Sequence, residues 1–354
     1  MRRPGFMVFF TAAIACFAVA ALWSLSPSPR LAIRPVSVPP FSRSALIRHA
    51  SASSIDKQHA RTNARVQKHT FSAIVSRLQS LGYLPLTRAF IHGAGGTRVR
   101  HDAFLWPVPR ALQAAADGYS WNRHNPFIRG AVVQFERYNG VLGPLGVSEG
   151  TLHAAVVKRL FSHQVKLDPA PWEWVYVTKA NGTSAPEMLH IYERGAHHAP
   201  AAFGSVRRGS LVHNGWIWGT VVNTGVLGPT PNGTYLIYQR LPKTTMQGVF
   251  PIPISMGEYR SLAGQKVPQW TGSPLMQPAR GMVNGHPVRW QPYKDPGILW
   301  VDYFDVGRGI HYYPRSAYGF PQSAGCVEEP YTSAPITYHL LRYGVPVTIS
   351  GNAF

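Results

Sequence analysis

The strongest candidates for chemistry in this 354-residue chain lie between residues 309 and 327, where His311 precedes Cys326 across a loop rich in Tyr, Pro and Gly. A cysteine attacks as its thiolate, and its ordinary pKa of about 8.5 leaves it mostly protonated at neutral pH. It therefore needs a basic partner, such as an imidazole. A strand that ends at His311 and a loop that folds back would bring the two side chains together. We predict that Cys326 is a nucleophile and His311 its base.

The residue before the cysteine is Gly325, in a Ser-x-Gly-Cys sequence that is typical of a turn. Without a Cβ atom, a glycine lets other backbone approach closely and leaves the neighbouring sulfur accessible. The N–H groups around Gly325 and Cys326 could then face the oxyanion of an attacked carbonyl. The local sequence therefore favours acyl-transfer chemistry.

The N-terminal residues indicate export. Arg2 and Arg3 precede an uncharged apolar run at residues 6–23, which is typical of a secretion signal. Residues 1–24 are predicted to be a signal peptide with an Ala-x-Ala site at 18–20, or a membrane anchor, because the run approaches the roughly 20 residues that span a bilayer. Cys16 lies in this run, so Cys326 is the single cysteine in the part of the sequence that follows the run. Such a thiol is either reactive or a small buried residue.

Composition narrows the fold and the partners. The chain has 33 Gly and 31 Pro residues, and they do not recur at a regular spacing. This composition favours a turn-rich, mainly β protein. The net charge of +20 favours polyanionic surroundings. Its Lys and Arg residues are scattered rather than gathered in a block, so anionic polymers or lipid headgroups are expected as partners and nucleic acid is not.

The chain divides by pattern into a linker and two folded parts. Residues 25–70 are rich in Pro and Ser and are predicted to be a linker. Residues 71–165 show helical spacing at 71–81, which Gly82 would end, at 128–139 and at 152–160, with Ser148 as a candidate cap. Residues 88–125 would be an insertion in this small three-helix module.

Residues 172–351 change to strand-like runs separated by turns. Strands are expected at 174–177, 188–192, 219–224, 234–238, 298–304 and 345–349, and a short helix at 336–343. Residues 248–296 have little periodicity and are predicted to be long loops. The second folded part is therefore expected to be mostly β.

Residues 77–84, 131–136 and 140–152 together resemble the small three-helix peptidoglycan-binding domain that often precedes wall hydrolases and transpeptidases. The resemblance implies that residues 71–165 bind cell-wall glycan. An unrelated helical spacer is the alternative.

The segment 309–327 resembles the signature of L,D-transpeptidases of the YkuD type, in which a His and a Ser-His-Gly-Cys motif are separated by a similar loop. Residues 222–225 and 229–234 resemble the strand and Thr-Pro-x-Gly turn of that family. The resemblance covers residues 172–349 and implies a β-sandwich-like catalytic domain at 172–351. It further implies that the cysteine forms an acyl-enzyme with a stem tetrapeptide, that D-alanine leaves, and that the acyl group is transferred to a diamino-acid amine. This reaction would serve cell-wall organisation and cell shape.

The resemblance also assigns roles. Cys326 would be the nucleophile and His311 the base, without a cofactor or metal. Oxyanion and loop support would come from Gly325, Ser323 and Ala324, and substrate contacts from Tyr318, Gly319 and Glu328. The partners would be peptidoglycan stem peptides, wall glycan and anionic wall polymers, and also the membrane if the N-terminal segment is uncleaved. The place of action would be extracytoplasmic.

Two positions depart from the family pattern: Ala324 replaces a His, and Glu328 replaces an Arg or Asn. Because the principal base would be His311, the first change need not abolish activity. The second places an acid near an anionic peptide, and like charges oppose binding. A catalytically silent wall-binding protein, or a Cys peptidase or amidase acting on wall peptides, therefore stays open.

Two further clusters are interpreted as structural. The spacing of His190, His197, His198 and His213 matches no common zinc pattern. A group of tryptophans is expected to pack in the core rather than stack on sugars; these are Trp172, Trp174, Trp216 and Trp218.

Overall fold

The computed structural model describes residues 69–84, 108–143, 148, 150–180, 185–194 and 215–351. Contacts divide the chain into Met1–His59 and Ala60–Phe354, and every described residue belongs to the second unit. The signal peptide or anchor predicted at 1–24, and nearly all of the linker predicted at 25–70, lie outside the described residues. In the part that is described, no helix is long and apolar enough to cross a membrane.

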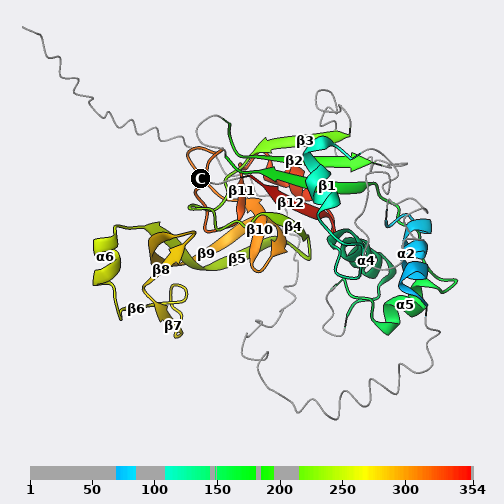
Figure 1. The fold of residues 1–354 in the computed structure, drawn as a ribbon, viewed down its shortest axis with the longest axis horizontal. Helices are drawn as coiled ribbons and strands as arrows, with labels where there is room; N and C mark the ends of the chain where they lie inside the picture. Colours follow the sequence, from blue (N-terminus) through cyan, green and yellow to red (C-terminus); the bar gives the residue numbers. More distant parts are fainter. Residues whose placement is uncertain are drawn as a thin grey trace, which may run out of the picture. The chain divides into compact units, whose positions relative to one another are not determined.

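Two sheets form the main body of the described unit (Figure 1). The first has the order β3-β2-β1-β12-β4, and the second the order β11-β10-β9-β5 with β8 also paired to β9. The strands of the first sheet are β1 Trp172–Thr178, β2 Met188–Arg194, β3 Trp216–Val221, β4 Gly233–Leu236 and β12 Pro346–Ser350. Those of the second are β5 Gln239–Pro253, β8 Arg280–Val283, β9 His286–Asp305, β10 Arg308–Tyr312 and β11 Val327–Glu329.

One buried cluster joins the two sheets. It contains Val175 and Val347 from the first sheet and Ile310 and Val327 from the second, each at most 1% exposed. Successive side chains of a strand point to opposite faces, and these four residues lie on the faces that meet between the two sheets. The predicted mainly β architecture is confirmed. A helix, α7 Ala334–Leu340, overlaps the helix predicted at 336–343 and precedes β12.

Three longer helices precede the strands, where helical spacing predicted them: α2 Phe71–Ser80, α4 Pro126–Asn139 and α5 Ala154–Leu160. Gly140 ends α4 with φ of 65° in the left-handed region that glycine adopts readily. The predicted cap of the third helix was wrong: its N-cap is His153, and Ser148 is buried. Gly150 lies between them at φ of 65°, so a helix starting at Ser148 could not continue. The predicted insertion includes η5 Arg110–Leu112 and α3 Gln113–Asp117.

These helices share a core with the first sheet. Trp172 and Trp174 of β1, 6% and 0% exposed, belong to the same buried cluster as residues of α2, α4 and α5. Trp174 also donates a hydrogen bond from Nε1 to Thr348 Oγ1 at 2.8 Å. The packing role predicted for these two tryptophans is confirmed. The predicted boundary between residues 165 and 172 stays a prediction.

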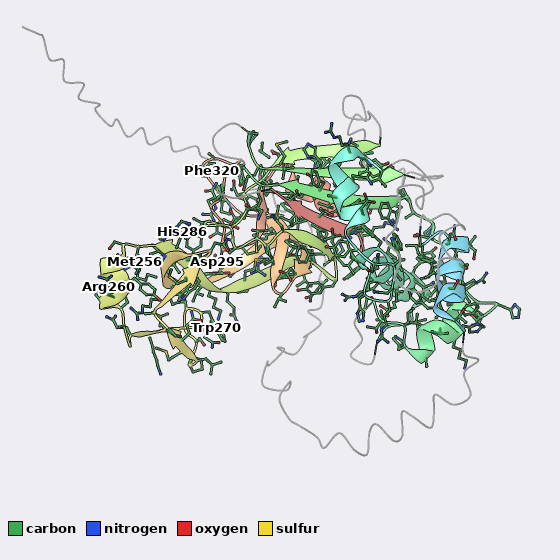
Figure 2. All side chains as sticks on the ribbon, viewed as in Figure 1. Met256, Arg260, Trp270, His286, Asp295 and Phe320 are labelled. Atoms are coloured by element: carbon green, nitrogen blue, oxygen red, sulfur yellow. The ribbon has the colours of Figure 1, made fainter. Side chains whose placement is uncertain are left out.

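The prediction of long loops at 248–296 was wrong. Strands β5 and β9 pair antiparallel along their length and form an extended ribbon. Its tip carries α6 Met256–Ser261, β6 Lys266–Pro268 and β7 Met276–Pro278, and Figure 2 shows Met256 and Arg260 on α6. Much of the ribbon is partly exposed, so burial does not enforce a clear apolar pattern. Prolines in both strands, as in the Val249–Pro292 pair, further obscured it.

Candidate active site

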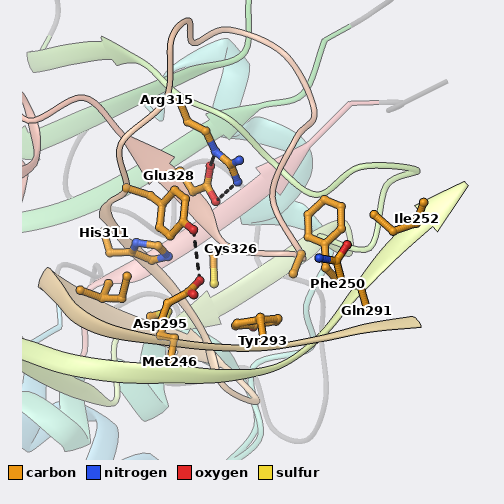
Figure 3. A pocket seen from close by; sticks show the side chains of 13 residues that line it. Met246, Phe250, Ile252, Gln291, Tyr293, Asp295, His311, Arg315, Cys326 and Glu328 are labelled. Atoms are coloured by element: carbon orange, nitrogen blue, oxygen red, sulfur yellow. Dashed lines mark hydrogen bonds and ion pairs between the residues drawn. The ribbon is translucent and has the colours of Figure 1, made fainter. Parts of the chain in front are cut away.

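A pocket of about 340 Å³ lies between the β5–β9 ribbon and the segment that contains Cys326 (Figure 3). It brings together four residues predicted for the site, namely Cys326, His311, Ala324 and Glu328. The remaining lining residues are Met246, Phe250, Ile252, Gln291, Tyr293, Asp295, Ile298, Tyr313 and Arg315. Its volume and mixed polar and apolar lining suit a small peptide segment.

One face of the ribbon forms a wall of the pocket. From 246 to 252 on β5 and from 291 to 295 on β9, the lining residues are two or four positions apart, because alternate side chains point to the same face. They are Met246, Phe250 and Ile252 on β5, and Gln291, Tyr293 and Asp295 on β9. Ile298, also on β9, lies beyond the register shift at Thr244/Thr245. The register sets Met246 opposite Asp295 and Phe250 opposite Gln291. Sequence reasoning missed all of these residues, because partial exposure and prolines leave the ribbon without a clear apolar pattern.

A glycine makes room for the central aromatic side chain of this wall. Gly248 lies opposite Tyr293, and a Cβ atom at Gly248 would lie 3.3 Å from the Tyr293 hydroxyl oxygen. The Tyr293 side chain therefore crosses to the neighbouring strand. Burial raises the pKa of the Tyr293 phenol, so this side chain stays neutral at physiological pH.

The Cys326 thiol is partly buried in the pocket. Burial raises its pKa to about 11, and the Glu328 carboxylate acts in the same direction. A backbone hydrogen bond from Gly309 and the Arg308 guanidinium act against this rise. In the unliganded protein at neutral pH the thiol is therefore protonated, and it requires a base when it attacks.

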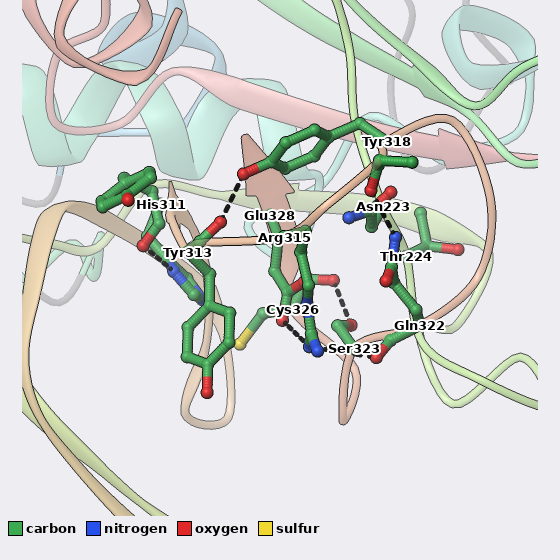
Figure 4. Close-up of polar contacts among 12 residues, drawn as sticks. Asn223, Thr224, His311, Tyr313, Arg315, Tyr318, Gln322, Ser323, Cys326 and Glu328 are labelled. Carbon is green, nitrogen blue, oxygen red and sulfur yellow. Dashed lines mark hydrogen bonds and ion pairs between the residues drawn. The ribbon is translucent and has the colours of Figure 1, made fainter. Parts of the chain in front are cut away.

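The imidazole of His311 is 2% exposed and lies beside Cys326 in both close-up views (Figures 3 and 4). Its Nδ1 is 2.9 Å from the carbonyl oxygen of Tyr312. A carbonyl can only accept, so Nδ1 carries the hydrogen and Nε2 carries the lone pair. Burial lowers the pKa of His311 below its ordinary 6.5, which keeps the ring neutral.

Nε2 of His311 has no hydrogen-bond partner among the described residues. A buried nitrogen with a free lone pair is therefore available to take a proton inside the pocket. No hydrogen bond joins it to the thiol, and catalytic contacts of this kind often form only when substrate is bound.

Ser323 fixes the turn that presents the cysteine. Its hydroxyl donates to the carbonyl oxygen of Cys326 at 2.7 Å and accepts from the N–H of Gly325 at 3.0 Å. Gly325 has φ of 136°, and a Cβ atom there would lie 3.0 Å from Nε of Arg308. The N–H of Gly325 is thus engaged by Ser323, which leaves that of Cys326 as the nearer candidate for an oxyanion.

The upstream Thr-Pro turn packs against this cysteine turn. The Thr230 hydroxyl donates to the carbonyl oxygen of Gly325 at 2.9 Å and accepts from the N–H of Gly225 at 2.8 Å. Gly225 also forms a parallel bridge with Ser323. The two sequence segments that resemble one family are therefore in contact.

Glu328 is locked to Arg315. Both Glu328 carboxylate oxygens accept hydrogen bonds from the guanidinium at 2.8 Å (Figure 4). The guanidinium also lies over the Tyr313 ring, 4.6 Å from its centroid. A bidentate pair of this kind neutralises the acid locally. The acidic replacement at position 328 therefore does not leave an uncompensated charge facing the substrate.

Tyr318 and Gly319 do not line the pocket. The Tyr318 hydroxyl donates to the carbonyl oxygen of Tyr313. The N–H of Gly319 donates to Asn223 Oδ1 at 3.0 Å, and its carbonyl oxygen accepts from the N–H of Glu187 at 2.8 Å. Both residues hold the loop that follows β10, and the pocket wall comes from other residues.

In the described part of the chain, no three His, Cys, Asp or Glu side chains are placed to hold a metal ion. Of the histidines interpreted above as structural, His190 is on β2, where its ring packs against Trp216. The others lie outside the described residues; these are His197, His198 and His213.

No protein-family model matches the chain, and no curated protein was found to be similar. Solved structures with some similarity include an L,D-transpeptidase from Mycobacterium smegmatis, with 14% sequence identity and a TM-score of 0.29. The match covers 51% of this chain and 59% of that protein. Another is the L,D-transpeptidase (Yku) from Stackebrandtia nassauensis, with 15% identity, 79% and 90% covered, and a TM-score of 0.28.

A third is L,D-transpeptidase 3 from Mycobacterium tuberculosis in complex with a faropenem-derived adduct, with 15% identity, 51% and 61% covered, and a TM-score of 0.30. The chain thus spans 59% of the M. smegmatis protein, less than two thirds of its length. Similarities at this level do not assign a family or an activity.

Proposed function

We propose that this chain is a peptidoglycan L,D-transpeptidase that forms an acyl-enzyme on Cys326 and transfers the acyl group to an amine. The observation that carries the proposal is the pairing within one pocket of the Cys326 thiol and the basic Nε2 of His311, oriented through Nδ1 by Tyr312. The resemblance of residues 309–327 to the family signature supplies the substrate class.

In the first step Cys326 attacks the carbonyl carbon that precedes the terminal D-alanine of a stem tetrapeptide. As the Sγ–C bond forms, the thiol proton passes to Nε2 of His311. The carbonyl oxygen becomes an oxyanion, for which the N–H of Cys326 is the candidate donor. When the C–N bond breaks, the imidazolium gives its proton to the departing amine, and D-alanine leaves behind a thioester.

In the second step the amine of a diamino acid in another stem attacks the thioester carbon. Its proton passes to Nε2 of His311, the Sγ–C bond breaks, and the thiolate takes the proton back. An amide cross-link and the resting enzyme result. Water in place of the amine would give hydrolysis through the same acyl-enzyme.

The two departures from the family pattern are compatible with this scheme. Ala324 lines the pocket but no step requires a titratable group there. Glu328 is held by Arg315, so the pair supplies no net charge. The chemistry needs Cys326, His311 and the turn built by Ser323 and Gly325.

We further propose that the protein acts outside the cytoplasm, carried there by residues 1–24. The helices at 71–165 would bind the wall, and the basic charge of the whole chain would favour anionic wall polymers.

The experiment is intact-mass analysis after incubation with a carbapenem, the inhibitor class that the resemblance implies. Wild type should gain the mass of one inhibitor molecule, because the opened ring acylates the thiol. Cys326→Ala should gain none, whereas Cys16→Ser, which removes the other thiol of the chain, should behave as wild type. An adduct that persists in Cys326→Ala, or a folded wild type that never forms one, would overturn the proposal.

A further inference from the structure

Asp295 is a pocket carboxylate that the scheme above does not use. It lies on β9, opposite Met246, and faces the cavity that holds Cys326 (Figure 3). Its Oδ2 accepts a hydrogen bond of 3.1 Å from the Tyr313 hydroxyl. Among the described residues it belongs to no ion pair. A neutral phenol compensates the charge of a carboxylate only in part.

The other ionisable groups of the pocket lining do not balance Asp295. Arg315 is committed to Glu328 through two hydrogen bonds. Burial keeps His311 neutral and the Cys326 thiol protonated. All lining residues are described, so the unliganded pocket has one uncompensated negative charge, in a chain whose formal net charge is +20.

Two aromatic rings flank this carboxylate. Tyr293 lies two positions along β9 on the same face, and Tyr313 is joined to Asp295 by the hydrogen bond. Their faces attract cations, and a carboxylate with neighbouring aromatic rings favours an ammonium group over a neutral or anionic one. Because Tyr313 already donates to Oδ2 of Asp295, the compact ammonium of a primary amine, which is a single point charge, can pair with the remaining Oδ1.

We propose that Asp295 is the specificity residue of this pocket and binds a primary ammonium group of the stem-peptide diamino acid. This inference rests on the transpeptidase function proposed above. The group belongs either to the third residue of the acyl donor or to the incoming acceptor, since both have the same chemistry. An acceptor bound as an ammonium first releases one proton to solvent, and the neutral amine then attacks the thioester. Asp295 binds substrate and positions its reacting group next to Cys326. His311 carries out the proton transfers.

The donor role is tested with two stem tetrapeptides, one with a free side-chain amine on its diamino acid and one with that amine acetylated. In wild type, acetylation should raise KM about 10- to 100-fold with little change in kcat, the loss expected for one charge-assisted hydrogen bond. Asp295→Asn should remove this discrimination. Glu258→Gln, which changes an exposed carboxylate on α6 far from the pocket lining, should retain it.

The acceptor role is tested with the acetylated tetrapeptide as a fixed donor and a stem tripeptide with a free amine as the acceptor. Here Asp295→Asn should raise the acceptor concentration that half-saturates transfer, again about 10- to 100-fold, and shift product toward hydrolysis. An effect in the first assay assigns the donor amine, and an effect in the second assigns the acceptor amine.

The inference is overturned if wild type uses both tetrapeptides with equal KM and a folded Asp295→Asn leaves the half-saturating acceptor concentration unchanged. It is also overturned if a folded Asp295→Asn retains full discrimination. Failure of the proposed function gives a different result, because wild type would then form no acyl-enzyme with either tetrapeptide.

Discussion

Arg315 holds both carboxylate oxygens of Glu328 through hydrogen bonds of 2.8 Å. Glu328 is on β11 directly after the cysteine turn, and Arg315 is in the loop that follows His311. The ion pair therefore ties together the two segments that provide the nucleophile and the base. An acid at this position is stabilising only while its partner is present.

Removing the cation should destabilise the protein. In Arg315→Met the buried Glu328 carboxylate loses its partner, and we expect the free energy of unfolding to fall by roughly 3 kcal/mol. Urea denaturation measures the change. Adding Glu328→Gln should recover much of the loss. The control is Arg289→Met, because Arg289 and Glu258 form an exposed pair at 3.7 Å and should contribute less than about 1 kcal/mol. Equal losses in Arg315→Met and Arg289→Met would contradict the role given to the buried pair.

The base is tested by the pH dependence of acylation. Because burial lowers the pKa of His311 below 6.5, the imidazole stays basic as pH falls, and the wild-type rate should decline only in acid below that value. His311→Ala should lose roughly 100- to 10,000-fold in rate at neutral pH. Its rate should rise with pH toward the Cys326 pKa of about 11, since hydroxide replaces the base.

Stopped-flow acylation by a carbapenem measures both profiles. His190→Ala is the matched control, because burial lowers the pKa of His190 as it does that of His311, but His190 is only partly buried and lies outside the pocket. Coincident profiles for wild type and His311→Ala would make His311 a structural residue.

The cysteine turn should not tolerate a side chain before Cys326. Gly325 has φ of 136°, and its Cβ position is 3.0 Å from Arg308 Nε, so Gly325→Ala strains the backbone by about 1–3 kcal/mol and displaces the thiol. We expect acylation to slow at least tenfold while the secondary structure measured by circular dichroism is kept. Gly264→Ala, at φ of 74° with open space around its Cβ position, controls for backbone strain alone; the account is wrong if both variants slow acylation equally.

A buried acid away from the pocket should make stability depend on pH. Glu329 is 1% exposed, and burial raises its pKa from 4.5 to about 8. The folded state therefore binds a proton that the unfolded state releases above pH 4.5, so this residue lowers the free energy of unfolding as pH rises from about 4.5 to 8.

Glu329→Gln preserves the acceptor for the Thr337 hydroxyl and should remove that part of the pH dependence. Urea denaturation at several pH values measures it, with Glu258→Gln as the exposed control. An unchanged slope between pH 5 and pH 8 in Glu329→Gln would show that Glu329 does not titrate as described.

The sequence predicted the part of the site that is local. Cys326, His311 and the turn with Ser323 and Gly325 lie within one short segment, so type and spacing were enough to select them. Short strand-like runs bounded by turns likewise predicted the strands of the first sheet, including β1 with Val175 and β12 with Val347.

The sequence did not predict the opposite wall of the pocket. Asp295 and Met246 meet through an antiparallel register between segments almost fifty residues apart, and a partly exposed ribbon does not need a strong apolar pattern. The Arg315–Glu328 pair was missed for a related reason, because the sequence shows an acid at position 328 but not the loop path that brings Arg315 to it.

The most direct test of the central claim is mass analysis of wild type incubated with a stem tetrapeptide and a stem tripeptide acceptor. We predict an acyl-enzyme that lacks the terminal D-alanine, followed by a cross-linked peptide product. Both should be absent in Cys326→Ala, and Cys16→Ser should form both. If folded wild type releases no D-alanine and forms no acyl-enzyme, or if Cys326→Ala produces the same cross-link, Cys326 is not the nucleophile of a transpeptidase.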